Sequence, residues 1–285
     1  PAARLHRPGG FRPHGYVRRQ RHHHRGEELM LLEIRGLGKR FGGLDAVKNI
    51  DLDVQAGQVT AVIGPNGAGK STLFNLIHGF YRPTAGSVAF NGRDITQSSP
   101  HNSVNGGIAR TFQTTHLFDD STLLENVLAG RIVRSKSTVF DAIFHTPRHR
   151  RESALNHDKA LEALEFCGVA EFRHDLASNV PQEVQKRTAV AMALATEPEL
   201  MLLDEPAGGI PEEETTDFGN LIRSLPSRGV SVLLVEHKMS MIMGLADTIL
   251  VLDHGQKLAI GSPAEIQSNP DVIRAYLGTT KDEEN

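Results

Sequence analysis

The stretch Gly-Pro-Asn-Gly-Ala-Gly-Lys-Ser occupies residues 64–71, and the interpretation of the whole chain starts from it. It matches the pattern G-x-x-x-x-G-K-[S/T], in which glycines let backbone N–H groups turn inward around phosphate oxygens. A β-branched run at 58–63 precedes it, and apolar residues at helical spacing follow over 70–78. This order places the positive end of a helix beside the bound anion. The stretch therefore predicts a site for a nucleoside triphosphate.

Individual residues of this loop have predictable tasks. Lys70 supplies a positive charge to the β- and γ-phosphates, and the Ser71 hydroxyl is placed to ligate Mg²⁺. The residues that we expect to hold the nucleotide here are Gly64, Pro65, Asn66, Gly67, Ala68, Gly69, Lys70, Ser71 and Thr72.

A second acidic motif lies downstream, where residues 200–205 read Leu-Met-Leu-Leu-Asp-Glu. A buried strand would deliver Asp204 to its end, beside the phosphate loop if the two strands are neighbours. Asp204 could then hold a hydrated magnesium ion, and Glu205 could polarise the attacking water. An ordinary strand that ends in a turn has the same pattern, so the motif gains its meaning from the phosphate loop upstream.

The rest of the chain alternates between predicted strands and helices. Strands at 31–36, 50–54 and 87–90 suit an antiparallel sheet with one wet face. Strands at 108–112, 200–203, 231–235, 248–252 and 257–260 alternate with helices at 212–225, 239–245, 263–269 and 271–277, which indicates a parallel sheet covered on both faces. Residues from about 122 to 197 contain no convincing strand and predict a helical insert. Within it, residues 134–151 are polar and basic and are interpreted as an exposed loop or a frayed helix.

Composition narrows the class of protein. The 285 residues are 39% hydrophobic and carry a formal net charge of −3, which is ordinary for a globular protein and gives no nucleic-acid signature. No apolar run approaches the roughly 18 residues that span a bilayer. Cys167 is the single cysteine and is expected to be a buried, inert thiol in a reducing, cytoplasmic setting.

The two ends of the chain differ from its middle. Residues 1–29 are rich in Arg, His, Pro and Gly, cannot build a core, and are expected to be disordered. Our hypothesis is that Met30 is the true start. Residues 279–285 are expected to form a flexible tail.

Three further segments extend the pattern, and with them the chain resembles the ATPase subunits of ABC transporters from Met30 to Gly278. Residues 109–113, Ala-Arg-Thr-Phe-Gln, resemble the Q-loop of that family. The resemblance implies that Gln113 touches the magnesium and water and links the site to a transmembrane partner. It also implies that His237 contacts the γ-phosphate and that Phe41 stacks on adenine. Without the family, Phe41 would be interpreted as a core residue and His237 as polar packing at a strand end.

The resemblance implies a fold and a set of partners. The expected fold is α/β: a P-loop NTPase with a RecA-like core, an antiparallel β subdomain and a helical insert. Two such chains would sandwich two molecules of ATP with Mg²⁺, head to tail. The partners would be transmembrane permease subunits, a second ABC ATPase and, indirectly, a periplasmic or extracellular binding protein, with no nucleic acid. The expected location is peripheral, on the cytoplasmic face of the inner or plasma membrane.

Other segments narrow the resemblance to one group of importers. Residues 41–47, 79–86 and 237–278 are similar to the larger ATPase of branched-chain amino acid importers. Urea and amide importers belong to the same group, and a lipopolysaccharide-type exporter is similar, so these alternatives stay open. The solute is inferred by association, because other subunits choose it. A non-transport ABC ATPase is disfavoured because the chain has one cassette, and a P-loop kinase because Gln113, Glu205 and His237 occur in the ABC order.

One segment departs from the family. The signature helix normally opens with Leu-Ser-Gly-Gly-Gln, and the residues at that position here are Val180, Pro181, Gln182, Glu183 and Val184. Pro181 has neither a hydroxyl nor an N–H, and Glu183 brings negative charge toward a polyanion. The following loop, 207–211, also lacks the usual Asp or Asn.

This departure predicts that the chain's own phosphate-binding site is intact, whereas the signature segment that it would offer to the partner's nucleotide is defective. The chain would then work as a heterodimer with a second ATPase of intact signature. Two alternatives are a substituted loop that binds phosphate through other groups and a mainly regulatory subunit that gates nucleotide without turnover.

Overall fold

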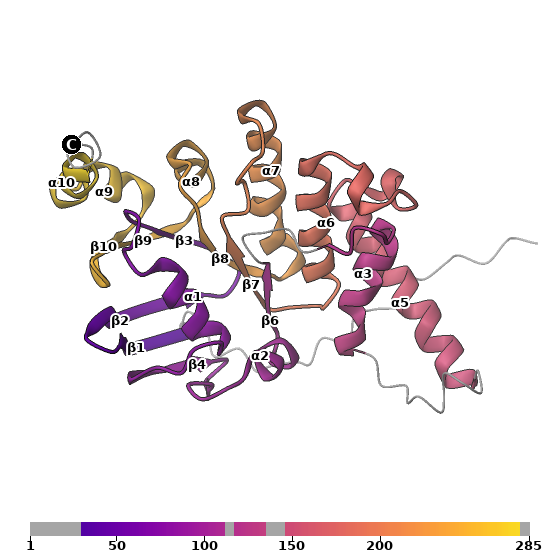
Figure 1. The fold of residues 1–285 in the computed structure, drawn as a ribbon, viewed down its shortest axis with the longest axis horizontal. Coiled ribbons are helices and arrows are strands. Elements are labelled where there is room, and N and C mark those ends of the chain that lie inside the picture. Colours follow the sequence, from indigo (N-terminus) through magenta and orange to yellow (C-terminus); the bar gives the residue numbers. More distant parts are fainter. Residues whose placement is uncertain (1–29, 112–116, 135–145, 280–285) are drawn as a thin grey trace, which may run out of the picture.

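The computed structural model describes residues 30–111, 117–134 and 146–279. The expected disordered segment 1–29, residues 280–285 of the expected tail 279–285, and Gln113 lie outside these ranges. A six-stranded sheet crosses the middle of the molecule (Figure 1). A four-stranded antiparallel sheet lies on one side of it, and helices cover the other.

The central sheet has the strand order β10-β9-β3-β8-β7-β6. Its strands are β3 (Val59–Ile63), β6 (Ile108–Thr111), β7 (Leu200–Asp204), β8 (Ser231–Val235), β9 (Thr248–Asp253) and β10 (Gln256–Gly261). All neighbours pair in parallel except β10, which runs antiparallel to β9. The predicted parallel sheet is confirmed. Asp204 was expected beside the phosphate loop only if β7 and β3 were neighbours. They are not, because β8 lies between them.

The antiparallel sheet has the order β2-β1-β4-β5. Its strands are β1 (Met30–Phe41), β2 (Leu44–Gln55), β4 (Ala85–Phe90) and β5 (Arg93–Asp94). The first two are longer than predicted. Their pairing shifts register between Ile34 and Leu37, which interrupts the alternation of apolar and polar residues on which the prediction relied.

Most of the described helices pack around the central sheet, and α1 (Lys70–His78) also contacts β2 of the antiparallel sheet. Around the central sheet they are α1, α2 (Pro100–Gly106), α7 (Glu212–Ser224), α8 (Met239–Leu245), α9 (Pro263–Ser268) and α10 (Pro270–Thr279). The sequence analysis missed α2, which begins with Ser99 as its cap and Pro100 in its first turn.

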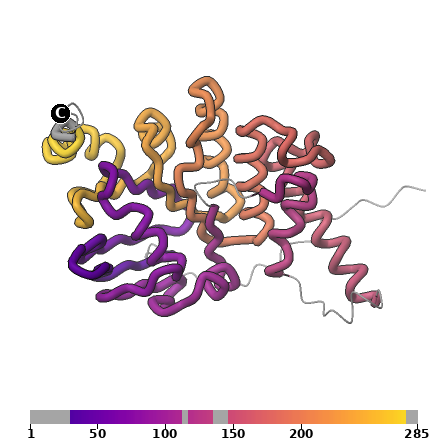
Figure 2. Tube along the Cα trace, viewed as in Figure 1, coloured from indigo at the N-terminus to yellow at the C-terminus, as the bar shows by residue number. Residues whose placement is uncertain are grey.

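Between β6 and β7 the described residues form a group of helices, which Figure 2 shows at the end of the molecule away from β10. Its main members are α3 (Leu123–Arg131), α5 (Pro147–Phe166) and α6 (Gln182–Leu194). Of the segment 134–151, which was interpreted as an exposed loop or a frayed helix, residues 147–151 form the start of α5, so the loop alternative does not hold for them. The Thr146 hydroxyl accepts a hydrogen bond from the His149 N–H at 3.3 Å and caps that helix. The division near residues 122 and 197 stays a prediction.

The central sheet separates two apolar cores. Along β7, Met201 and Leu203 face one core, and Leu200 and Leu202 face the other. Alternate residues of a strand point to opposite faces, so a strand buried on both sides is apolar throughout. This burial fixes the ends of β3, β7 and β8, from which the polar residues of the candidate site project.

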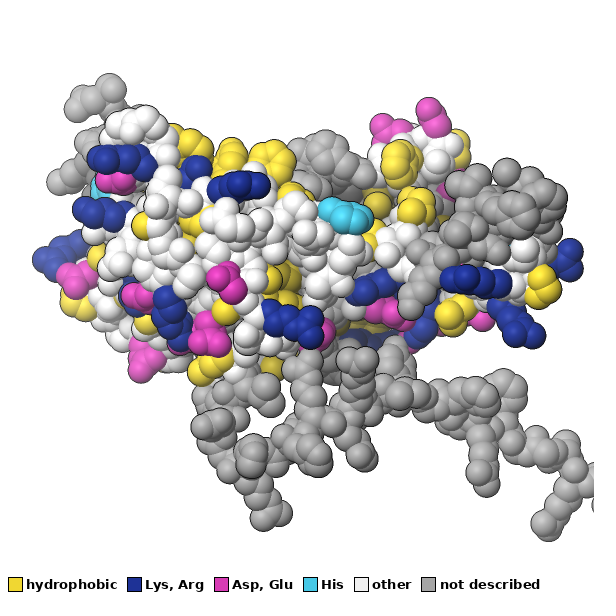
Figure 3. Space-filling model, turned by 90° about the horizontal axis from the view of Figure 1, so that it is seen from below, with side chains coloured by type: hydrophobic (Ala, Val, Ile, Leu, Met, Phe, Trp, Pro, Cys, Tyr) yellow, Lys and Arg dark blue, Asp and Glu magenta, His cyan; other side chains and the backbone are white. Residues whose placement is uncertain are grey.

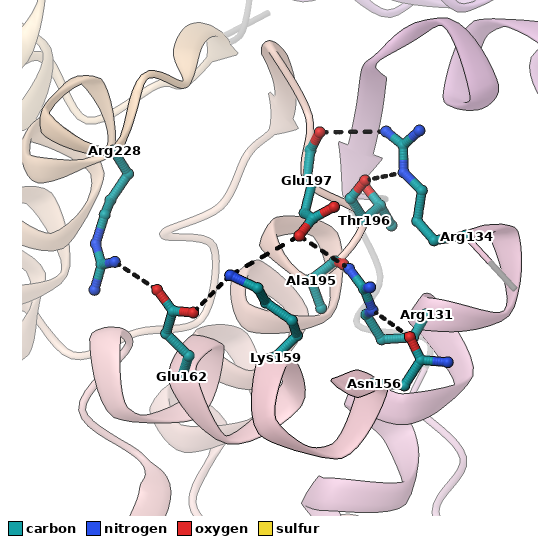
Figure 4. Close-up of polar contacts among 9 residues, drawn as sticks. All are labelled: Arg131, Arg134, Asn156, Lys159, Glu162, Ala195, Thr196, Glu197 and Arg228. Atoms are coloured by element: carbon teal, nitrogen blue, oxygen red, sulfur yellow. Dashed lines mark hydrogen bonds and ion pairs between the residues drawn. The ribbon is translucent and has the colours of Figure 1, made fainter. Parts of the chain in front are cut away.

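Arginines of the helical group hold the far end of α6. Arg131 Nη1 donates to the carbonyl of Ala195 at 2.7 Å, and Arg134 Nε donates to that of Thr196 at 2.6 Å (Figure 4). These carbonyls lie at or just beyond the helix C-terminus, where backbone acceptors lack helical partners. A chain of ion pairs continues from Glu197 through Lys159 and Glu162 to Arg228.

Charges of both signs are interspersed on the face seen from below, with apolar side chains between them (Figure 3). Among the residues that the structure describes, no helix combines the length and apolarity needed to cross a membrane.

Candidate functional site

The phosphate loop joins β3 to α1 and takes a conformation that its glycines permit. Gly64 has φ 151° and Gly69 has φ 97°, in the region that favours glycine. A Cβ on Gly64 would lie 2.1 Å from the Leu252 carbonyl oxygen, and one on Gly69 would lie 2.5 Å from that of Ala46. Without side chains at these two glycines, β9 and β2 can pack directly against the loop, so tertiary contacts fix its shape.

Lys70 is buried at the start of α1. Its Nζ donates to the carbonyls of Gly64 at 2.7 Å and Pro65 at 2.9 Å. Burial lowers the pKa of Lys70, and the charges of Glu205 and Asp204 partly oppose this effect. The ammonium therefore lies within electrostatic reach of both predicted carboxylates.

Glu205 and His237 lie together although 32 positions separate them. His237 Nε2 is 2.9 Å from Glu205 Oε1. Glu205 follows β7 with φ 48°, an unusual backbone angle for a residue other than glycine. Its N–H donates to the Val235 carbonyl at 2.9 Å, which ties it to the end of β8. Because β7 and β8 are neighbours, the two side chains that follow them meet.

Asp204 is buried at the end of β7. Its Oδ2 accepts a hydrogen bond from Arg110 Nη2 at 2.9 Å. Its Oδ1 is buried and has no hydrogen-bond partner among the described residues. Arg110 also donates through Nη1 to Asn75 Oδ1 at 2.6 Å.

One open pocket contains most of the predicted residues. Phe41, the loop from Asn66 to Thr72, Glu205 and His237 all line it. Phe41 is 42% exposed, which rules out the interpretation as a core residue. The Phe41 ring packs edge to face against the Tyr81 ring, with 5.2 Å between the two ring centroids. Lys39 Nζ lies 5.0 Å from the centroid of the Phe41 ring.

The structure adds residues that the sequence analysis missed. Leu44, Asp45, Ala46, His254 and Gly255 also line the pocket. Two backbone hydrogen bonds bring Gly255 there, from Lys48 N to Gly255 O at 2.7 Å and from Gly255 N to Ala68 O at 3.1 Å. His254 and Gly255 lie in the turn between β9 and β10, and the approach of this turn to the phosphate loop depends on the order of the strands.

Glu236, between β8 and His237, was also missed. It is 4% exposed, and its Oε2 accepts a hydrogen bond from Ala207 N at 3.1 Å. Its Oε1 accepts one from His237 N at 3.0 Å. A buried acid directly after an apolar strand was the available signal. The Glu236 carboxylate thus joins the loop after Glu205 to the segment that carries His237.

The signature segment lies elsewhere, at the start of α6. None of its five residues is among those that line the pocket. Pro181 occupies the cap position and provides no side-chain hydrogen bond to the helix. The Glu183 carboxylate accepts a hydrogen bond from Arg187 Nε at 2.5 Å, and both side chains are mostly buried. This pair offsets part of the negative charge that Glu183 adds to the segment.

Gln182 packs against the loop that follows Glu205. A Cβ added to Gly209 would lie 2.4 Å from Gln182 Nε2. The signature segment is therefore in contact with residues 207–211, the loop that also departs from the family pattern.

Comparison with known families gives two matches. Residues 47–208 match the family model described as "ABC transporter". Residues 256–282 match one described as "Branched-chain amino acid ATP-binding cassette transporter".

Relatives resemble the chain over nearly their whole length. The high-affinity branched-chain amino acid transport ATP-binding protein LivG of Salmonella typhimurium is 41% identical over 249 residues, which cover 87% of this chain and 98% of LivG. The protein BraF of Pseudomonas aeruginosa, with the same description, is also 41% identical over 249 residues, with the same coverage of both chains.

Solved structures agree. A nucleotide-free ATP-binding cassette from an ABC transporter is 31% identical, with a TM-score of 0.76, and covers 87% of this chain and 98% of its own. The ADP conformation of such a cassette has a TM-score of 0.77, is also 31% identical, and covers 87% and 99%. These neighbours confirm the predicted fold class.

Proposed function

Because this chain belongs to the family of ABC transporter ATP-binding proteins, we propose that it hydrolyses ATP to power an importer of branched-chain amino acids. The observation that carries this proposal is the pocket that brings the phosphate loop together with the Glu205–His237 pair. A phosphate cradle and an acid beside it are the parts that hydrolysis of a nucleoside triphosphate requires.

The proposed solute follows from the relatives. LivG and BraF are described as branched-chain amino acid transport proteins, and both match over almost their full length. The family model that matches residues 256–282 is also described as one of branched-chain amino acid transporters and supports the same class of solute. Other subunits select the solute, so the support is similarity and not a pocket on this chain.

We assign nucleotide binding to the residues that line the pocket. Phe41 is exposed at its edge and offers an aromatic face to adenine. Lys70 would exchange the carbonyls of Gly64 and Pro65 for the β- and γ-phosphates, whose full charges attract an ammonium more strongly than neutral carbonyls do. The N–H groups in the first turn of α1 add the positive end of that helix.

The side chains fit a hydrated Mg²⁺ ion. The buried Oδ1 of Asp204 lacks a hydrogen-bond partner among the described residues, and a bound cation or its water would satisfy it. Ser71 lines the pocket, whereas Asp204 is buried and is not among its lining residues. Hydroxyl and carboxylate oxygens are the ligands that Mg²⁺ prefers. Gln113, the third expected ligand, lies outside the described residues. When bound, Mg²⁺ supplies positive charge that offsets the charge on the phosphates.

The chemical step is assigned to Glu205 and His237. The Glu205 carboxylate would accept a hydrogen bond from the attacking water and raise its nucleophilicity. His237 holds that carboxylate through the 2.9 Å contact and lines the same pocket as the phosphate loop, where it would contact the γ-phosphate. The hydrogen bond from Glu205 N to Val235 O keeps the acid in place despite its unusual backbone angle.

We propose that a second ABC ATPase completes the assembly. Pro181 cannot offer a hydroxyl or an N–H to a phosphate across a dimer, and the paired Glu183 offers a carboxylate where the family has glycine. A partner with an intact signature would complete this chain's cradle. The assembly would bind permease subunits at the cytoplasmic face of the membrane.

Reconstitution with permeases and a second ATPase tests the proposal. We expect uptake of radiolabelled leucine into proteoliposomes only when this chain and ATP are present on the same side. Uptake of urea without leucine would assign a different solute. A chain that binds no ATP in the presence of magnesium would contradict the ATPase function itself.

A further inference from the structure

We infer that Arg110 is a positioning residue, which fixes the orientation of the Asp204 carboxylate for the magnesium-bound nucleotide; this inference rests on the proposed function.

Arg110 lies where three elements of the site meet. It comes from β6, the strand that pairs in parallel with β7. Its Nη2 donates to Asp204 Oδ2 at 2.9 Å, at the end of β7. Its Nη1 donates to Asn75 Oδ1 at 2.6 Å, on the helix that begins at Lys70. The Arg110 and Asp204 side chains are only 6% and 5% exposed.

The shape of the guanidinium makes this contact directional. Its N–H groups form a rigid planar fork, so binding Asn75 and Asp204 together fixes the plane of the fork and the carboxylate on it. The carboxylate oxygen Oδ2 is then occupied, and Oδ1 is the oxygen left without a partner among the described residues. Arg110 thereby determines which oxygen of Asp204 is offered to a ligand.

Asn75 connects this orientation to the phosphate loop. It belongs to α1, whose first residues are Lys70 and Ser71. Its backbone carbonyl also accepts hydrogen bonds from the N–H groups of Phe80 at 2.8 Å and Tyr81 at 3.1 Å. The helix that carries the proposed serine ligand and the strand that carries the proposed aspartate ligand are therefore held at a fixed spacing through one guanidinium.

Charge alone predicts the opposite effect. A cation beside Asp204 repels a second cation, so an Arg110 that acted only by its charge would weaken magnesium binding. Removing such a charge would strengthen binding. If Arg110 positions the Asp204 carboxylate, its removal should weaken magnesium binding, because the carboxylate is then free to rotate away from the geometry that a ligand needs. The sign of the change separates the two roles.

The experiment measures the affinity of the full chain for a fluorescent, non-hydrolysable ATP analogue as magnesium is titrated. The variants are Arg110→Met, which removes the charge and the fork, Arg110→Lys, which keeps the charge, and Asn75→Ala, which keeps Arg110 but frees one side of it. Arg131→Lys is the matched control, since Arg131 is also a buried arginine but holds the C-terminus of α6. Thermal unfolding shows which variants are folded.

We expect the magnesium concentration at the midpoint of the titration to be at least about 10-fold higher in Arg110→Met and Arg110→Lys than in the wild type. Losses of this size are typical when a residue that orients a metal ligand is replaced. Asn75→Ala should shift the midpoint in the same direction by less. Binding of the analogue in EDTA should stay within about twofold of the wild type, because the phosphate loop itself is unchanged.

Three results would overturn the positioning role: an unchanged magnesium midpoint in Arg110→Lys, tighter magnesium binding in Arg110→Met, or an equal shift in Arg131→Lys. If Arg110→Met does not fold, Arg110→Lys and Asn75→Ala decide the question. A wild-type chain whose affinity does not depend on magnesium would instead contradict the proposed function.

Discussion

Two helices of this protein, α1 and α6, begin at segments that their family uses to contact phosphate, yet they are built differently. The first turn of α1 carries no acid, follows Gly69, and opens into the pocket with Lys70. The first turn of α6 follows Pro181 and carries Glu183, which is paired with Arg187. An acid at a helix N-terminus stabilises the helix by occupying the site that an anion would take. The start of α1 is free to bind a ligand, whereas the start of α6 is used for its own stability.

The C-terminal ends of the two helices also differ. The C-terminus of α6 is held by two arginines, Arg131 and Arg134, that donate to backbone carbonyls. The last residue of α1 is His78, which is buried beside Arg110 and has its pKa lowered to about 4, mainly by burial and further by the charge of Arg110. The C-terminus of α6 thus binds two arginine side chains, whereas the C-terminus of α1 ends in a histidine that stays neutral near pH 7.

The largest expected effect tests the α1 end directly. Lys70→Ala should reduce ATPase activity by about 10³-fold, because a cradle loses its charged donor to the transferred phosphate. Steady-state hydrolysis by the complete assembly measures this change. The matched variant in α6, Glu183→Gln, should alter the rate of hydrolysis at this chain's own cradle by less than about threefold, since Glu183 does not line the pocket. Equal losses in both variants would remove the difference between the helices.

Glu205→Gln separates binding from hydrolysis. We expect a loss of about 10²–10³-fold in kcat, because the amide no longer acts as a base toward water. The affinity for ATP should remain within a few fold of the wild type, measured with a fluorescent analogue. Loss of binding without loss of kcat would assign Glu205 to nucleotide binding instead.

His78 should make stability depend on acid pH. The folded chain keeps the imidazole neutral down to about pH 4, whereas the unfolded chain takes up a proton near pH 6.5. Its contribution is fully present above pH 6.5 and is lost as pH falls toward 4, by about 3 kcal/mol over that window. Urea unfolding of the wild type and His78→Leu at pH 7 and pH 4.5 measures it. The variant should lose less stability on acidification, and parallel pH profiles would contradict the assignment.

Arg131→Ala tests the opposite end of α6. We expect a loss of about 2–3 kcal/mol in the free energy of unfolding, because the carbonyl of Ala195 and the amide of Asn156 lose a buried charged donor. Urea denaturation measures the loss. Nucleotide affinity should not change, since Arg131 does not line the pocket, and a large change in affinity would show that the two regions are coupled.

The smallest expected effect comes from repairing α6. Pro181→Ser combined with Glu183→Gly restores a hydroxyl and an N–H at the signature position and removes the carboxylate. Hydrolysis by the chain alone should rise by about 10-fold, which corresponds to roughly 1.4 kcal/mol of transition-state stabilisation. Strong activity of the unmodified chain, unaffected by the two substitutions, would contradict the heterodimer.

The sequence alone predicted the phosphate loop, the helix α1 with its observed bounds, and the alternation that gives a parallel sheet. These features depend on contiguous residues, because glycine spacing and apolar periodicity act within one segment. The acidic motif after a predicted strand also indicated Asp204 and Glu205, whereas His237 and Phe41 were predicted only from the resemblance to the family.

The tertiary structure alone decided which of these side chains meet. The sheet places β8 between β3 and β7, so the assumed neighbours are separated, while Glu205 and His237 meet across β7 and β8. Arg110 reaches Asp204 across a different strand pair, and Glu183 forms an ion pair with Arg187 one turn further along its own helix. Contacts between distant residues depend on the order and register of strands, and no local pattern in the sequence encodes that order.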